Sequence, residues 1–166
     1  DFDFVKRNYE YMKLLMAFYI ERAAWKGFIP KINSSWIVID WHDIEKDGYS
    51  CAVQMLYGKA LNVMVFFAEQ MHANEDMQYY RLLAEQVYQN VNEIFWSDTQ
   101  NGYVSNYCDG KPSTQICHHQ NCFGILFDYA DDAKKEAIIE NVYKNSAVKE
   151  ITTPFFKFFQ YEAMYQ

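Results

Sequence analysis

Residues 52–72 read AVQMLYGKALNVMVFFAEQMH, an apolar stretch whose helical repeat leaves almost no polar face. Apolar side chains recur three and four positions apart from Val53 to Met71, which predicts a helix. Much of the opposite side is filled by Met55, Val63, Val65, Phe66 and Phe67. A helix that is apolar nearly all round is buried in a protein interior. This stretch therefore predicts a buried helix in a helical domain.

The next helical pattern has a different character. Residues 80–95 place Leu83, Val87 and Val91 on one stripe and charged or amide side chains opposite, so this helix faces water on its outer side. Two concentric helical layers produce this order, in which a helix that is apolar on all sides is followed by an amphipathic helix. The sequence therefore predicts an all-α fold, an α/α toroid or half of one. No motif repeats at a spacing of about 34 or 40 residues, which argues against a helical repeat array.

The remaining elements are predicted from similar patterns. Asn101-Gly102 stands between two apolar pairs and is a tight-turn signal, which predicts one short β-hairpin or extended loop through Gly110. Thr153-Pro154 is an N-cap followed by a first-turn proline, where a helix begins. Further helices are predicted at 4–26, 117–129 and 133–144.

Composition and charge limit the class of protein. The chain has 166 residues, one domain at most, and its hydrophobic fraction of 51% with 19% aromatics predicts a well-packed core. A formal net charge of -7 without a Lys/Arg cluster argues against a nucleic-acid partner and against an anionic membrane surface. No stretch reaches the ~18 uncharged apolar residues of a membrane span, and no signal pattern opens the chain.

The four cysteines are too few and too scattered for a disulfide framework, although one pair could form a bridge. They leave the compartment open, with a periplasmic or extracellular location preferred over the cytoplasm. The segment from Cys117 to Cys122 also contains His118 and His119, and cysteine and histidine are the usual ligands of a zinc site. The spacing argues against zinc, because adjacent histidines on a helix point about 100° apart and no C-x-x-C partner occurs elsewhere. We therefore expect buried thiols and one histidine that faces a pocket, with neither a metal nor a cofactor.

Residues 35–43, SWIVIDWHD, carry the chemistry that points to a function. Two indoles, Trp36 and Trp41, flank Asp40 in a long connection between predicted helices, and long ordered connections are disproportionately functional. Sugars stack their apolar faces on aromatic rings and offer hydroxyl groups to charged side chains. The cluster therefore predicts a carbohydrate site, while a buried loop plug capped by Asp40 is an alternative explanation of the same residues.

Five segments together resemble a family of glycoside hydrolases, the inverting α-L-rhamnosidases, whose catalytic domain is an (α/α)6 barrel. Residues 37–41 resemble the family's F-x-D-W segment, and residues 119–127 resemble its S-Q-H-x-N-A-L-A-L-L-F helix. The other similar segments are the helix that follows Asp47-Gly48-Tyr49, the aromatic turn at 95–104 and the Thr-Pro helix at 153–163. All five occur in the family's order, so the resemblance covers nearly the whole chain.

The resemblance implies a carbohydrate-active segment of a bacterial-type enzyme that hydrolyses terminal α-L-rhamnosyl linkages with inversion. It implies that Asp40 binds sugar hydroxyls and that Trp41 and Trp36 form a wall of the sugar pocket. His119 is implied as a lesser contact. The implied partners are a rhamnosylated glycan or glycoside and the remainder of the catalytic domain, with no cofactor, metal, nucleic acid or membrane.

Two departures from the family concern the catalytic groups. The family's general acid is a glutamate upstream of the Asp-Trp loop, which nothing before Trp36 matches, and its general base lies beyond the Thr-Pro helix. We therefore expect residues 1–166 to be a fragment of a larger (α/α)6 catalytic domain that is inactive alone. Asp40 and Asp43, on one loop, are poorly placed to straddle a sugar ring as the missing pair. A non-catalytic carbohydrate-binding or scaffold domain and a different helical-barrel glycosidase are the alternatives.

Overall fold

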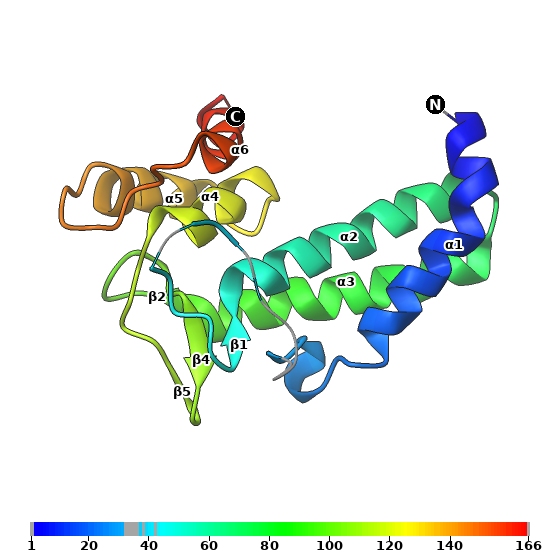
Figure 1. The fold of residues 1–166 in the computed structure, drawn as a ribbon, viewed down its shortest axis with the longest axis horizontal. Helices are drawn as coiled ribbons and strands as arrows, with labels where there is room; N and C mark the ends of the chain where they lie inside the picture. The colour runs from blue at the N-terminus through cyan, green and yellow to red at the C-terminus, as the bar shows by residue number, and fades with distance from the viewer. Residues whose placement is uncertain (1, 32–36, 38, 42, 166) are drawn as a thin grey trace.

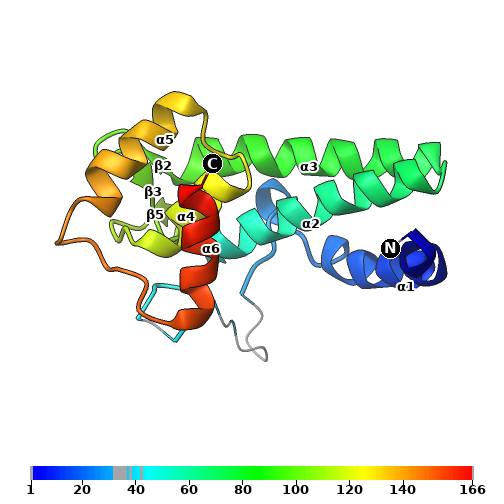
Figure 2. The ribbon, with the colours of Figure 1, turned by 90° about the horizontal axis from the view of Figure 1, so that it is seen from above.

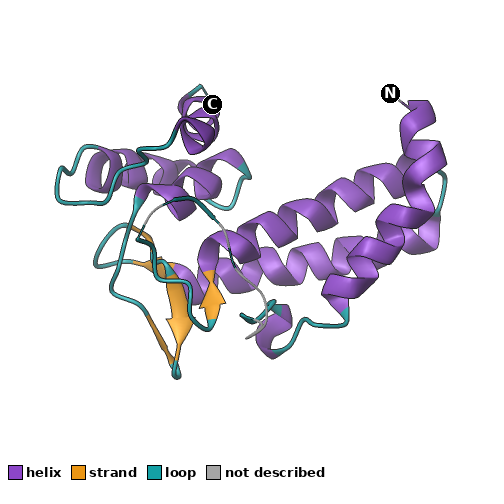
Figure 3. Cartoon of the chain, in the orientation of Figure 1, coloured by secondary structure: helices purple, strands orange, loops and turns teal. Residues whose placement is uncertain are grey.

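The computed structural model describes residues 2–31, 37, 39–41 and 43–165, and most of them are helical, which confirms the predicted all-α class (Figure 3). The α-helices are α1 (Phe2–Ile20), α2 (Cys51–Gln70), α3 (Asn74–Phe95), α4 (His118–Leu126), α5 (Asp132–Ile138) and α6 (Pro154–Met164). The shorter elements are a 3-10 turn (Trp25–Gly27), a π-helical turn (Ile139–Tyr143) and strands β1 (Tyr49–Ser50), β2 (Trp96–Ser97), β3 (Gly102–Tyr103), β4 (Asn106–Cys108) and β5 (Lys111–Pro112).

Helices α2 and α3 form a long hairpin, and α1 lies along its α2 side (Figures 1 and 2). The predicted stripe of α3 is buried, including Ala84, Val87 and Val91. On α2 one side is buried as predicted, whereas Leu56 and Phe66 on another side are 42% and 55% exposed. The prediction of burial nearly all round therefore holds for only part of α2 within the described residues.

By length and composition α2 also meets the requirements for a membrane-spanning helix, with a mean hydropathy of 1.4 over its best window. Helix α2 meets these requirements although it contains two charged residues, Lys59 and Glu69. Half of that window, 50%, is buried inside the structure. A helix in a protein core meets the same requirements, and α2 packs against α3, α4 and α1.

Two small sheets connect the helices. Asn101, with a φ of 52°, closes the predicted hairpin of β2 and β3, in which Trp96 pairs with Tyr103. A second antiparallel sheet, in the order β1-β4-β5, was not predicted. Its strands have two or three residues each, which is too short for an alternating apolar pattern to be visible in the sequence.

Several helix bounds differ from the prediction. Helix α1 ends at Ile20, and the chain continues through a 3-10 turn to Gly27, whose φ is +70°. The predicted helix at 133–144 is divided into α5 and the π-helical turn. At α6 the prediction is confirmed, because Thr153 caps the helix by accepting the N–H of Phe156 at 3.3 Å.

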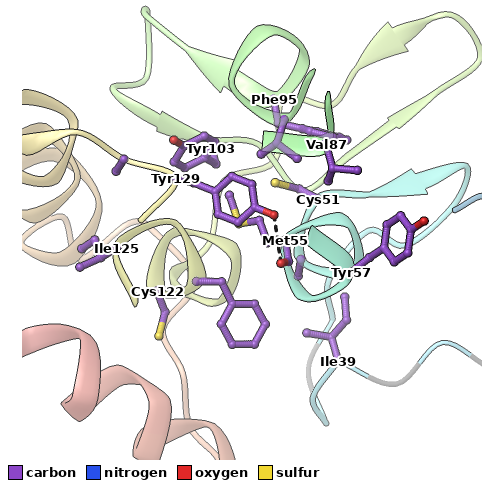
Figure 4. Packing of buried hydrophobic residues seen from close by; sticks show 14 of the residues in the cluster. Ile39, Cys51, Met55, Tyr57, Val87, Phe95, Tyr103, Cys122, Ile125 and Tyr129 are labelled. Carbon is purple, nitrogen blue, oxygen red and sulfur yellow. Dashed lines mark hydrogen bonds between the residues drawn. The ribbon is translucent and has the colours of Figure 1, made fainter. Parts of the chain in front are cut away.

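The core requires a close approach between α2 and the segment after α4. Tyr129 stacks on Tyr88 with ring centroids 3.9 Å apart. The Tyr129 hydroxyl donates to the carbonyl oxygen of Met55 at 3.1 Å (Figure 4). A Cβ placed on Gly58 would lie 2.1 Å from this hydroxyl oxygen. Only glycine leaves room for the tyrosine at that point of α2.

A buried amide fixes the start of the loop that leads to the candidate site. Gln54 of α2 is fully buried, and its Oε1 accepts the N–H of Ile29 at 2.8 Å. Its Nε2 donates to the carbonyl oxygens of Ile29 at 2.9 Å and Ser50 at 3.2 Å. One side chain thus satisfies backbone groups at both ends of the loop, where an unpaired buried group would destabilise the fold.

Candidate functional site

Asp40 lies at the centre of the candidate site, and its side chain is completely buried, with 0% exposure. Its Oδ1 accepts hydrogen bonds from the N–H of Trp41 at 2.8 Å and from Oγ1 of Thr153 at 2.6 Å. Its Oδ2 lies 2.8 Å from Nε2 of His119. An ionised carboxylate only accepts hydrogen bonds, so this nitrogen carries the hydrogen. The carboxylate therefore joins three segments of the chain.

Two helices begin at the residues that hold this carboxylate. His119 is the second residue of α4, and Thr153 is the N-cap of α6. Oγ1 of Thr153 donates to Asp40 while it accepts the N–H of Phe156. The N-terminal end of a helix carries partial positive charge and favours an anion there. The N-terminal end of α6, where Thr153 holds the carboxylate, therefore favours the ionised form of Asp40.

Burial by itself raises the pKa of the Asp40 carboxyl, because the charged form loses its water. The hydrogen bonds from Thr153, His119 and the N–H of Trp41 outweigh burial, and the pKa is lowered from its ordinary value of 3.8. Asp40 is therefore ionised at neutral pH and has no proton to donate. This geometry suits an anchor better than a general acid.

The residue after this anchor is on the surface. Trp41 is 77% exposed and lies between Ile39 and Ile44, each of which is only 5% exposed. Beyond Trp41, Nζ of Lys149 contacts Oδ2 of Asp43 at 2.8 Å and the Asp43 carbonyl oxygen at 2.9 Å. The loop is thus anchored on both sides of the indole. An exposed, anchored indole offers a flat apolar surface of the kind that stacks on a sugar ring.

The polar residues at the start of α4 are used inside the fold. Oδ1 of Asn121 accepts the N–H of Tyr103 at 2.8 Å, and its Nδ2 donates to the carbonyl oxygens of Tyr103 and Cys117 at 3.0 and 2.9 Å. Nε2 of Gln120 donates to the same Tyr103 carbonyl at 2.8 Å. These bonds fasten the β2-β3 hairpin to α4 and so fix the helix that carries His119.

The two adjacent histidines have different surroundings, as their helical spacing predicts. Nε2 of His118 lies 3.2 Å from the carbonyl oxygen of Val142, and burial lowers the pKa of this imidazole. The ring of His119 packs against Phe156 with centroids 4.7 Å apart. Both histidines are buried, whereas the sequence predicts one that faces a pocket. Within the described part of the chain, no three His, Cys, Asp or Glu side chains are grouped so that they could hold a metal.

The structure brings together two of the four residues that the family resemblance implies for the sugar site. Asp40 and His119 are in direct contact, and Trp41 follows on the surface. Trp36 lies outside the described residues. Thr153 was not among the predicted site residues. Its only sequence signal is its N-cap position, which indicates where a helix starts but not what the hydroxyl group contacts.

Two solved structures share the fold of this chain. A GH78 family rhamnosidase from Bacillus sp. GL1 matches with a TM-score of 0.88 at 22% identity, covering 99% of this chain and 17% of that chain. A rhamnosidase from Klebsiella oxytoca with rhamnose bound matches with a TM-score of 0.75 at 20% identity, covering 91% of this chain and 28% of that chain. No curated protein sequence matches the chain. The fold is therefore that of part of a helical-barrel glycosidase domain.

Residues 1–153 match the family model of the bacterial alpha-L-rhamnosidase 6 hairpin glycosidase domain. The chain belongs to this family. The resemblance to the rhamnosidase family and the predicted helical-barrel architecture are both confirmed. The chain spans about a sixth of the Bacillus protein, 17%, and 28% of the Klebsiella protein.

Proposed function

We propose that the full-length polypeptide carrying this chain is an α-L-rhamnosidase that hydrolyses terminal α-L-rhamnosyl linkages with inversion. Its substrate is a rhamnosylated glycan or glycoside. The observation that carries the proposal is the family match over residues 1–153. The likeness to the Klebsiella oxytoca rhamnosidase, whose structure contains rhamnose, supports the choice of sugar.

In the proposed site, Trp41 stacks on the sugar ring, and Trp36 forms a further part of the wall. The exposure of the Trp41 indole supports its role, because a buried indole could not reach a ligand. Asp40 and His119 lie behind Trp41 and belong to the same site. The contact between Asp40 and sugar hydroxyls that the family resemblance implies stays a prediction.

We infer that the chain forms part of a larger (α/α)6 catalytic domain. Helix α1 lies at one end of the molecule, and α6 lies with α4 and α5 toward the other end (Figure 1). Both helices expose large apolar side chains, which include Phe4, Tyr11, Leu14 and Leu15 on α1 and Phe155, Phe158, Tyr161 and Met164 on α6. Extended apolar surface of this kind marks an interface. Further helices of the same domain would cover both surfaces.

The catalytic acid and base are proposed to come from outside residues 1–166. Inversion needs two carboxyl groups about 6.5–9.5 Å apart, one protonating the leaving oxygen and one activating water. Asp40 is buried, ionised and bonded to three protein donors. Asp43 lies on the surface in an ion pair with Lys149. We therefore propose that the isolated chain does not hydrolyse glycosides.

Release of nitrophenol from a panel of aryl glycosides by the full-length polypeptide tests the function. Cleavage of the α-L-rhamnoside alone supports the proposal. Cleavage of a different glycoside would support a helical-barrel glycosidase and exclude rhamnose as its sugar. Absence of cleavage across the panel would argue against a glycosidase and favour a carbohydrate-binding or scaffold domain.

A further inference from the structure

The surroundings of Asp40 favour a role other than contact with the sugar. Both carboxylate oxygens already accept hydrogen bonds from protein groups, and the side chain has 0% exposure. Oδ2 accepts only one of these bonds and could accept another, but with 0% exposure a sugar hydroxyl could reach it only by moving the protein groups that cover it. Moving the Thr153 hydroxyl or the His119 imidazole would break buried hydrogen bonds, which opposes binding.

We propose that Asp40 is a positioning residue that orients the Trp41 indole through the backbone. The proposal rests on the proposed function of Trp41 as the surface on which the sugar stacks. Oδ1 of Asp40 holds the N–H of Trp41, which restrains the peptide group between the two residues. Because Trp41 is 77% exposed, packing contributes little to the position of its ring, so the backbone from which the ring projects has a larger share in where the indole lies.

The other two bonds of the carboxylate tie the loop to rigid elements. Oγ1 of Thr153 belongs to the N-cap of α6, and Nε2 of His119 belongs to the first turn of α4. A binding surface held by packed helices loses less freedom when the ligand arrives, which strengthens binding. The Asp40 carboxylate thus links Trp41 to the ends of two helices.

Positioning and direct contact predict different results for Thr153, whose hydroxyl donates to Oδ1 of Asp40. If Asp40 positions Trp41, Asp40→Asn and Thr153→Val each raise KM for an aryl α-L-rhamnoside about fivefold in the full-length polypeptide, while kcat stays within about twofold. The double variant is then no worse than the more impaired single variant, because both changes break one network. If Asp40 contacts the sugar directly, Thr153→Val leaves KM unchanged and the two effects are additive.

Two matched variants separate positioning from general loss of stability. Thr153→Ser keeps the hydroxyl that both caps α6 and donates to Asp40, so it restores the KM of the original protein. Asp131→Ala removes another helix cap, whose Oδ1 accepts the N–H of Lys134 at 2.9 Å. Its stability falls like that of Thr153→Val, but its KM stays unchanged. A raised KM in Asp131→Ala would overturn the proposal.

A spectroscopic readout does not depend on enzyme activity. In the full-length polypeptide labelled with 5-fluorotryptophan, the ¹⁹F resonance of Trp41 is assigned by its loss in Trp41→Phe. The proposal expects this resonance to shift or split in Asp40→Asn and Thr153→Val and to stay unchanged in Asp131→Ala. An unchanged resonance in Asp40→Asn would overturn positioning even if rhamnoside is cleaved. A shifted resonance without rhamnoside cleavage would support positioning and reject only the proposed function.

Discussion

Asp40 and His119 lie 79 residues apart in the sequence and meet inside the protein, with Oδ2 of the carboxylate 2.8 Å from Nε2 of the imidazole. Both side chains have 0% exposure. This contact joins the loop that carries Trp41 to the first turn of α4, at the end of the helix that the β2-β3 hairpin fastens in place. The candidate sugar surface is therefore coupled to the helical core.

The lowered pKa of Asp40 predicts a pH-dependent contribution to stability. Asp40→Asn should lower the free energy of unfolding of the full-length polypeptide by about 1–3 kcal/mol at neutral pH, because charge-assisted hydrogen bonds are lost. The folded pKa lies below the ordinary value of 3.8. The advantage of aspartate is therefore fully present above that value and is lost as the pH falls through the folded pKa.

Denaturant unfolding of both proteins, from neutral pH down to about pH 2, measures this difference. The two free energies should converge at the acid end of the series. A difference that stays constant over the series, or that grows toward acid pH, would show that ionisation of Asp40 does not stabilise the fold.

Removal of the exposed indole should affect binding and not stability. Trp41→Ala is expected to lower kcat/KM for an aryl α-L-rhamnoside about tenfold, while the free energy of unfolding changes by less than about 0.5 kcal/mol. The reason is that Trp41 is 77% exposed and contributes little packing. Steady-state kinetics and denaturant unfolding of the same preparation measure both quantities.

Trp25 provides the matched control for this variant. Its ring stacks on Tyr107 with centroids 4.6 Å apart, so it supports the fold near β4. Trp25→Ala should therefore lower stability by about 1–3 kcal/mol and leave kcat/KM nearly unchanged. If the two variants showed the reverse pattern, the sugar surface would have to be placed near Trp25 instead.

The close approach at Gly58 gives a prediction about the core. Gly58→Ala should destabilise the protein by about 1–3 kcal/mol although alanine is the better helix former, because the new Cβ would lie 2.1 Å from the Tyr129 hydroxyl oxygen. Tyr129 cannot move aside easily, since it stacks on Tyr88 and donates to Met55.

Removal of the Tyr129 hydroxyl tests whether its contact with the new Cβ causes the loss of stability. In a Tyr129→Phe background the nearest remaining atom would be Cγ1 of Val87 at 3.0 Å, so Gly58→Ala should cost clearly less there. Thermal unfolding of the four proteins in this cycle measures the coupling. An equal cost in both backgrounds would mean that contact with Tyr129 is not the origin of the effect.

The sequence predicts the parts of the fold that have long periodic patterns. Helices α2 and α3 are 20 and 22 residues long, which is enough for an apolar stripe to be visible. The strands of the β1-β4-β5 sheet are set by pairing between distant segments, as between Tyr49 and Tyr107, and no local pattern indicates them. The cap at Thr153 was predicted because capping depends on neighbouring residues alone.

The site was predicted in its residue types but not in its contacts. A carboxylate beside an indole suits a sugar, which points to Asp40 and Trp41, and the family resemblance points to His119. That Asp40 is buried against His119 and Thr153 depends on tertiary packing, which brings positions 79 and 113 residues away to the same carboxylate. A sequence pattern shows which side chains are present, whereas their burial decides whether they bind a ligand or hold the fold.

The stereochemistry of hydrolysis tests the central claim most directly. Proton NMR spectra, recorded as the full-length polypeptide cleaves an aryl α-L-rhamnoside, distinguish the anomer that is released first from the one formed later by mutarotation. An inverting mechanism predicts that β-L-rhamnose appears first and then equilibrates. Initial release of α-L-rhamnose, or no release of rhamnose, would contradict the account.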